Sequence, residues 1–178
     1  MRALLVSRAF VCCLCFFVYS SCFALSFETG ASYEVCFSPN HTCSYLIVRA
    51  LDGAKKSVRV QAYSFTSKRI AKALVKAKDR GIHVKVIVDK SQFEKGTFSR
   101  VPYLLKQGIP IFKDDKVSIA HNKVMIIDDE TVVTGSYNFT VSADRYNAEN
   151  LLVIKDKGLA KHYTANWLRR FKSSTPVT

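Results

Sequence analysis

His121 and Lys123 are the residues whose types and spacing best suit chemistry on a phosphate. Two residues apart on a β-strand, their side chains lie on the same face. The Lys123 ammonium can offset the negative charge of a phosphoryl group, while a neutral His121 imidazole can attack phosphorus or exchange a proton. The pair therefore favours phosphoryl chemistry with an imidazole nucleophile.

A β-hairpin centred near Asp129 would bring further polar groups to Lys123. The register of such a hairpin places Gly135 or Ser136 opposite Lys123. Glycine lets the backbone approach closely, and Ser136 and Asn138 add hydrogen-bond donors. We therefore expect Ser136 and Asn138 to bind the substrate together with Lys123.

Two carboxylates of the same stretch are expected to have different roles. Glu149 comes at the start of the next strand, where a carboxylate can fix the tautomer of His121 and stabilise its charged form. Asp128 has the opposite strand parity to His121 and Lys123. We expect Asp128 to hold the turn rather than to touch the substrate.

The elements that must position these residues alternate between strands and helices. The hydrophobic periodicity and the turn residues predict strands at residues 33–37, 57–63, 83–89, 109–112, 123–127, 131–135 and 150–155, and helices at 42–55, 67–80, 98–107 and 159–171. The pattern predicts one α/β domain with a mixed β-sheet between helical layers.

The spacing of the polar residues resembles the signature of the phospholipase D superfamily. The matching residues are His121-x-Lys123, Asp128, Gly135-Ser136-x-Asn138, the following Phe139-Thr140, and Glu149. The segment 61–66 resembles that family's second strand and its exit loop. The resemblance covers about residues 33–171 and is closest to small bacterial endonucleases with one His-x-Lys motif per chain.

This resemblance implies a role for each matching residue. His121 would be the nucleophile that forms a phosphohistidine intermediate. Lys123 and Asn138 would bind the non-bridging phosphate oxygens, with Ser136 assisting, and Glu149 would hydrogen-bond His121. No metal and no cofactor is expected.

The same mechanism needs a second histidine, to protonate the leaving oxygen and then activate water. The pair His83-x-Lys85 resembles the motif, but only three residues separate Lys85 from Asp89 and no Gly-Ser-x-Asn follows. His41 falls in a turn-like segment and His162 in the last helix. We therefore expect the second histidine to be His121 of a twofold partner, which makes the protein a homodimer with a shared active site.

The first 24 residues predict a signal peptide. Arg2 and Arg8 form a basic start, residues 9–19 are apolar, and small residues lead to Ala24. The apolar core is shorter than the roughly 20 residues that span a bilayer. A periplasmic or secreted domain of residues 25–178 is expected, and an uncleaved N-terminal membrane anchor is the alternative.

Two cysteines remain when this segment is removed. Cleavage would take Cys12, Cys13, Cys15 and Cys22 with it and leave Cys36 and Cys43. An even pair in an oxidising compartment predicts a disulfide. A metal site formed with His41 is the alternative, but it lacks a fourth ligand.

The chain carries a formal net charge of +13. Such an excess of bases attracts polyanions, either nucleic acid or an anionic bilayer surface. The leading hypothesis is an exported, metal-independent phosphodiesterase that cleaves DNA or RNA with little sequence preference. The alternatives are a lipid phosphodiesterase acting on phosphatidyl headgroups or cardiolipin, and a non-catalytic nucleic-acid binder.

Overall fold

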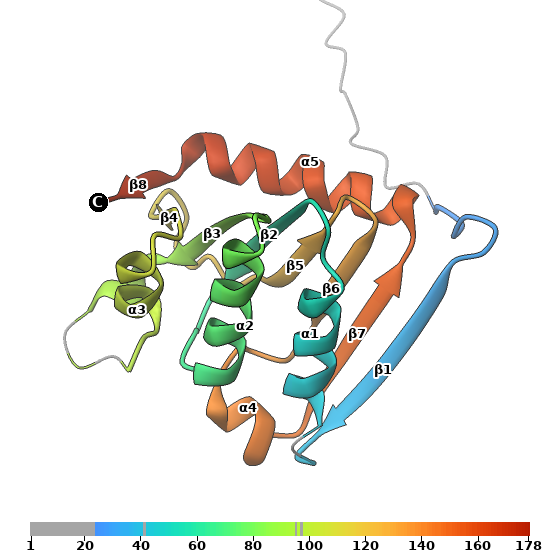
Figure 1. Cartoon of the computed structure of the whole chain (residues 1–178), viewed down its shortest axis with the longest axis horizontal. Helices are drawn as coiled ribbons and strands as arrows, with labels where there is room; N and C mark the ends of the chain where they lie inside the picture. The colour runs from blue at the N-terminus through green and yellow to red at the C-terminus, as the bar shows by residue number, and fades with distance from the viewer. Residues whose placement is uncertain (1–23, 41, 95, 97) are drawn as a thin grey trace, which may run out of the picture.

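A computed structural model describes residues 24–40, 42–94, 96 and 98–178 (Figure 1). In this part of the chain, eight strands form a single sheet in the order β1-β7-β6-β5-β2-β3-β4-β8. The strands are β1 (Ser32–Ser38), β2 (Ser57–Ala62), β3 (His83–Asp89), β4 (Ile111–Asp114), β5 (Lys123–Ile127), β6 (Thr131–Gly135), β7 (Glu149–Lys155) and β8 (Thr175–Val177). The pairs β2–β3 and β3–β4 are parallel and the others antiparallel, so the sheet is mixed, as predicted.

Helices cover both faces of this sheet. They are α1 (Cys43–Asp52), α2 (Lys68–Asp79), α3 (Val101–Lys106), α4 (Val141–Arg145) and α5 (Lys157–Ser173), with a short 3₁₀ turn, η1, at Lys90–Phe93. Buried side chains of α1, α2 and α3 form one core cluster with the sheet, and buried side chains of α5 form a second cluster on the opposite face. The predicted α/β sandwich is therefore confirmed.

Strand β5 lies in the middle of the sheet, and all five of its residues are buried. Met125 and Ile127 belong to the cluster under α1 and α2, whereas Val124 and Ile126 pack with Trp167 of α5. The Trp167 Nε1 group donates to the Val60 carbonyl at 3.0 Å. Burial of each large apolar side chain contributes about 1.5–3 kcal/mol to stability. This burial holds β5, the strand that carries Lys123, in place.

The structure differs from the predicted elements where they are short. The helix expected at residues 98–107 begins only at Val101, because Pro102 suits a first helical turn and Phe98 before it is 88% exposed. The elements η1, α4 and β8 were not predicted. Each has three to five residues, too few for a hydrophobic period to show.

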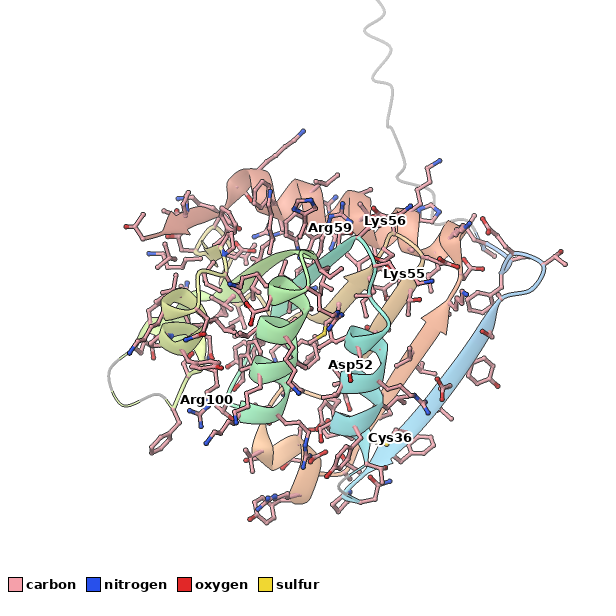
Figure 2. All side chains as sticks on the ribbon, in the orientation of Figure 1. Cys36, Asp52, Lys55, Lys56, Arg59 and Arg100 are labelled. Carbon is pink, nitrogen blue, oxygen red and sulfur yellow. A yellow bond between two sulfur atoms is a disulfide. The ribbon has the colours of Figure 1, made fainter. Side chains whose placement is uncertain are left out.

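Cys36 and Cys43 form a disulfide that joins β1 to the first residue of α1, with the two Cα atoms 5.5 Å apart. Figure 2 labels Cys36 on β1 beside α1. The predicted signal peptide, residues 1–24, lies outside the described residues apart from Ala24. No helix in the described part of the chain is both long and apolar enough to cross a bilayer.

Candidate active site

The expected site residues come together at one end of the sheet, where β2 ends and β5 begins. Lys123 pairs with Ala62, and the Tyr63 N–H donates to the Asn122 carbonyl at 2.9 Å. The β5–β6 register pairs Met125 with Val133, and continuing it by two residues brings Lys123 opposite Gly135. The hairpin symmetry expected from the sequence is therefore present.

Lys123 is buried at this end, with 9% of its surface exposed. Its ammonium donates to the backbone carbonyl of His121 at 2.8 Å and lies 5.1 Å from the centre of the Tyr63 ring. Burial lowers the pKa of Lys123, and the negative charge of Glu149 partly opposes that effect. A partly desolvated cation of this kind gains more from an incoming anion than a fully hydrated one does.

His121 precedes Lys123 with its side chain exposed. The imidazole packs against the Tyr63 ring, with the ring centres 4.5 Å apart and the planes tilted by 58°. Tyr63 thus contacts both members of the His-x-Lys pair. The sequence showed Tyr63 only as a residue near a strand end, since a ring contact across two strands leaves no local pattern.

Glu149 is held from both sides by neighbouring polar side chains. Its Oε2 accepts from the Ser136 hydroxyl at 2.6 Å, and its Oε1 accepts from the Asn147 amide at 2.9 Å. The Ser136 oxygen in turn accepts from the Asn150 N–H at 3.0 Å. The described contacts contain no hydrogen bond from His121 to Glu149, so that bond stays a prediction, and Asn147 is a partner that the sequence did not point to.

Gly135 allows β6 and β7 to meet closely beneath this group. Its φ of +146° and the position of the Asn150 carbonyl, 2.3 Å from where a Cβ would lie, leave room for glycine alone. The N–H groups of Ser136 and Tyr137 both donate to that carbonyl, at 3.1 and 3.2 Å. This close approach of β6 and β7 brings the Ser136 hydroxyl within hydrogen-bonding distance of Glu149.

Asn138 lies half-buried in the loop after β6. Its side-chain Oδ1 is buried and has no hydrogen-bond partner among the described residues. An unpaired buried acceptor costs about 1–3 kcal/mol. Because the two ends of an amide exchange by rotation, Asn138 can turn its NH₂ group, a double donor, toward a phosphate oxygen.

Asp128 lies in the β5–β6 turn at the opposite end of β5 from Lys123. Asp128 and Asp129 have φ values of 57° and 56°, in the left-handed region, and form the centre of the turn that the Glu130 N–H closes by donating to the Ile127 carbonyl at 3.0 Å. The Asp128 carboxylate accepts from the N–H groups of Lys55, Lys56 and Ser57 at 2.7–2.9 Å. Burial by itself raises the pKa of Asp128, but these donors outweigh it, and the pKa lies below its ordinary value. These contacts support a role in the turn.

Asp89, which the sequence showed only as the acid after the His83-x-Lys85 pair, supports the loop that carries His121. Its side chain is 2% exposed, and Oδ2 accepts from the Ala120 N–H at 2.7 Å, one residue before the histidine. Oδ1 accepts from the Ser91 N–H at 2.9 Å and so caps η1. Burial raises the pKa of Asp89, but the bonds from Ser91 and Ala120 and the charge of Lys90 hold it below its ordinary value.

The other described histidines lie elsewhere. His83 pairs with Ser57 at the start of β2, five residues or about 16 Å from the Ala62–Lys123 pair. His162 is exposed on α5, which covers the opposite face from α1 and α2. His41 lies outside the described residues. Among the described histidines, His121 alone lies at this end of the sheet.

No group of three or more His, Cys, Asp or Glu side chains suited to hold a metal ion forms among the residues that the structure describes. Several polar side chains meet at the described site. These are an exposed imidazole, a buried ammonium, an amide and a hydroxyl bonded to a carboxylate.

Known proteins are similar to this chain in sequence. A family model described as "Cardiolipin synthase, PLD-like domain" matches residues 47–171. A phospholipase D from Rickettsia prowazekii is 39% identical over 155 residues, which is 87% of this chain and 75% of that protein. A mitochondrial cardiolipin hydrolase from Xenopus laevis is 31% identical over 76% of this chain and 63% of its own length.

Solved structures extend the likeness to the fold. Nuc, a phospholipase D family member from Salmonella typhimurium, superposes with a TM-score of 0.77 at 38% identity, over 83% of this chain and 98% of its own. NucT from Helicobacter pylori gives a TM-score of 0.76 at 25% identity, over 83% of this chain and 99% of its own. The chain belongs to the phospholipase D superfamily, with the Nuc-type proteins, and is a hydrolase of phosphodiester bonds.

Proposed function

We propose that this hydrolase is an exported endonuclease that cleaves DNA or RNA, with little sequence preference, through a phosphohistidine on His121. The observation that carries the chemistry is that the buried Lys123 ammonium and the exposed His121 imidazole lie against the same Tyr63 ring, with the ammonium bonded to the His121 backbone carbonyl. The net charge of +13 supports a polyanionic substrate. The likeness to Nuc and NucT supports the same choice.

The reaction proceeds in two displacements. A ring nitrogen of His121 attacks phosphorus while Lys123 and Asn138 hold the non-bridging oxygens, and the bond from phosphorus to the leaving oxygen breaks. A second imidazolium gives its proton to that oxygen. The same imidazole then takes a proton from water, the water oxygen attacks phosphorus, and the phosphorus–nitrogen bond breaks to restore His121.

The second imidazole comes, in this proposal, from His121 of the partner subunit. One exposed apolar surface supports a twofold dimer: the outer stripe of β1, formed by Tyr33, Val35 and Phe37, which are 69%, 48% and 64% exposed. Phe37 pairs with Asn150, next to Glu149, so the stripe runs up to the site. An exposed patch of this kind is typical of an interaction surface, and we propose that a second copy of the chain binds to it about a twofold axis.

Export is supported by two features. The first 24 residues have the composition of a signal peptide. The Cys36–Cys43 disulfide is a bond that persists in oxidising compartments.

Lipid hydrolysis is the second candidate function, because the Rickettsia prowazekii and Xenopus laevis relatives carry the names phospholipase D and mitochondrial cardiolipin hydrolase. A substrate panel separates the two. Purified mature protein is incubated with plasmid DNA, RNA, and vesicles of phosphatidylcholine or cardiolipin, with His121→Ala as the inactive control and EDTA in a parallel set.

We expect nicking of DNA and cleavage of RNA that survive EDTA and disappear in His121→Ala. Acid-quenched enzyme should carry the phosphoryl group on His121. Vesicle hydrolysis without any nucleic-acid cleavage would favour the lipid function, and complete loss in EDTA would reject the metal-independent mechanism.

A further inference from the structure

A cleft with a volume of about 400 Å³ opens beside the catalytic end. Its walls are the first turns of α2 and the segment from Thr140 to Arg145, which includes α4. Figure 1 shows α4 next to the start of α2. The cleft is separate from the group formed by His121, Lys123 and Glu149, and none of the roles described above uses it.

The cleft is strongly positive. Lys68, Arg69 and Lys72 line it from α2 and Arg145 from α4, against the single carboxylate of Asp144. That carboxylate is buried and accepts from the Ser44 N–H, the Ser44 hydroxyl and the Tyr137 hydroxyl, at 3.1, 3.0 and 2.9 Å. Its remaining charge faces Arg69 at 3.4 Å. The Asp144 carboxylate is therefore already paired, and Arg69 also donates to the Ser44 and Tyr45 hydroxyl groups.

The other three cations have no such partner. Lys68, Lys72 and Arg145 are exposed, and no described residue forms a hydrogen bond or an ion pair with their side chains. Three positive charges therefore line one cleft with no ion-pair partner of their own among the described residues. Self-repulsion of this kind destabilises the fold unless an anion relieves it.

Two of the cations also occupy positions that a helix disfavours. Lys68 and Arg69 are in the first turn of α2, where the helix dipole is positive, and that turn contains no acidic residue. Acidic residues would stabilise α2 there. The stability of the helix therefore does not explain the charge distribution of the cleft, whereas an anionic ligand would.

The cleft is directly next to the phosphate-binding loop. Thr140, which lines it, is two residues after Asn138, a separation of at most about 7 Å along an extended chain. The N–H groups of Thr66 and Ser67 donate to the Phe139 carbonyl at 3.1 and 3.0 Å and hold the two walls together. An anion in the cleft thus lies beside the phosphate that Asn138 is proposed to hold.

We propose that this cleft binds a phosphate group of the nucleic-acid strand that neighbours the one being cleaved. The inference rests on the proposed nuclease function and names the part of the substrate that it engages. Contacts from lysine and arginine to phosphate position a strand without reading its bases. A subsite built from Lys68, Lys72 and Arg145 therefore gives register and affinity with no sequence preference.

The test compares two double variants that each remove two lysine charges. Lys68→Gln/Lys72→Gln changes the cleft. Lys55→Gln/Lys56→Gln changes two exposed lysines before β2, at the end of the molecule away from α4, where Figure 2 labels them. The substrates are a dinucleotide with one phosphodiester and a tetranucleotide with three, and kcat/KM is measured at several salt concentrations.

In the wild type, kcat/KM should rise from the dinucleotide to the tetranucleotide. In Lys68→Gln/Lys72→Gln we expect that ratio to fall at least about tenfold. The slope of log kcat/KM against log salt for the tetranucleotide should become shallower by about one to two units. Lys55→Gln/Lys56→Gln should keep both the ratio and the slope.

Equal losses in the two double variants would overturn the inference, because they would show a general charge effect instead of a subsite. An unchanged ratio in Lys68→Gln/Lys72→Gln would overturn it as well. In both cases His121→Ala abolishes cleavage and the nuclease function stands. If the wild type hydrolyses phospholipid vesicles and neither oligonucleotide, the proposed function itself fails and the inference fails with it.

Discussion

At the scale of single residues, Asp89 holds the loop that carries His121, the proposed nucleophile. Replacing it by Asn leaves one acceptor and one donor facing the N–H groups of Ser91 and Ala120, so one of these bonds is lost. We expect Asp89→Asn to lower kcat about tenfold with little change in KM, because His121 is displaced while the phosphate ligands remain. The measurement is steady-state cleavage, with Asp52→Asn, an exposed acid labelled in Figure 2, as the control. A matching loss in the control would contradict the positioning role.

The charge of Asp89 also gives stability a pH dependence. Its pKa in the folded protein lies below its ordinary value, about 3.9 in an unfolded chain. The stabilisation is therefore fully present above about pH 4 and is lost as pH falls through the folded pKa. Urea unfolding at pH 7 should show Asp89→Asn less stable than the wild type by about 1–3 kcal/mol, and the gap should shrink below pH 4. A gap that stays constant down to pH 2 would argue against this account.

We expect Lys123 to set the alkaline limit of activity. Burial lowers its pKa, so its ammonium is lost at a lower pH than that of a free lysine, near 10.4. Arginine stays charged throughout. We expect Lys123→Arg to have a lower kcat, because the larger guanidinium group fits the site poorly. The variant should keep its remaining activity to higher pH than the wild type. Profiles of kcat/KM between pH 7 and 11 test this, with Lys76→Arg on the surface of α2 as the control.

At the scale of elements, the β5–β6 turn ties the strand of Lys123 to the strand beside it. Asp128→Asn keeps a side chain that tolerates positive φ but removes the charge and one acceptor lobe from the three N–H groups of residues 55–57. We expect a loss of about 1–2 kcal/mol in the free energy of unfolding. Turnover per folded molecule should remain, since the turn is at the far end of β5 from Lys123. Lost turnover with intact stability would place Asp128 in the chemistry instead.

The elements that the sequence predicts well are those that bury repeated apolar residues. Strands β3, β5 and β6 begin and end where the alternation of branched residues does, and the parity of β5 separates Lys123 from Asp128. The supports of the site could not be predicted in this way. Asp89 and Gln92 act through bonds between segments far apart in the sequence, such as the 3.0 Å bond from the Phe65 N–H to Gln92, and Asn147 acts through a side-chain bond to Glu149. Such contacts have no period and appear only when the chain is folded.

At the scale of the whole molecule, the outer stripe of β1 is expected to be the dimer surface. Phe37→Glu places a charge in an apolar contact, which should weaken dimerisation at least about tenfold. Phe98→Glu is the matched control, because Phe98 is 88% exposed in the segment before α3. Sedimentation equilibrium of both variants gives the measurement. Dimers of equal strength in the two variants would exclude this face of β1 from the interface.

A shared active site has a consequence that separate sites do not have. If each site uses His121 from both subunits, a mixed dimer of wild type and His121→Ala contains no complete site. After subunit exchange in an equal mixture, half of the wild-type subunits are in mixed dimers. Activity per wild-type subunit should then fall to about half, and further as the variant is added in excess. Constant activity per wild-type subunit would mean that one chain completes the reaction alone, so the second proton donor would have to lie within the same subunit.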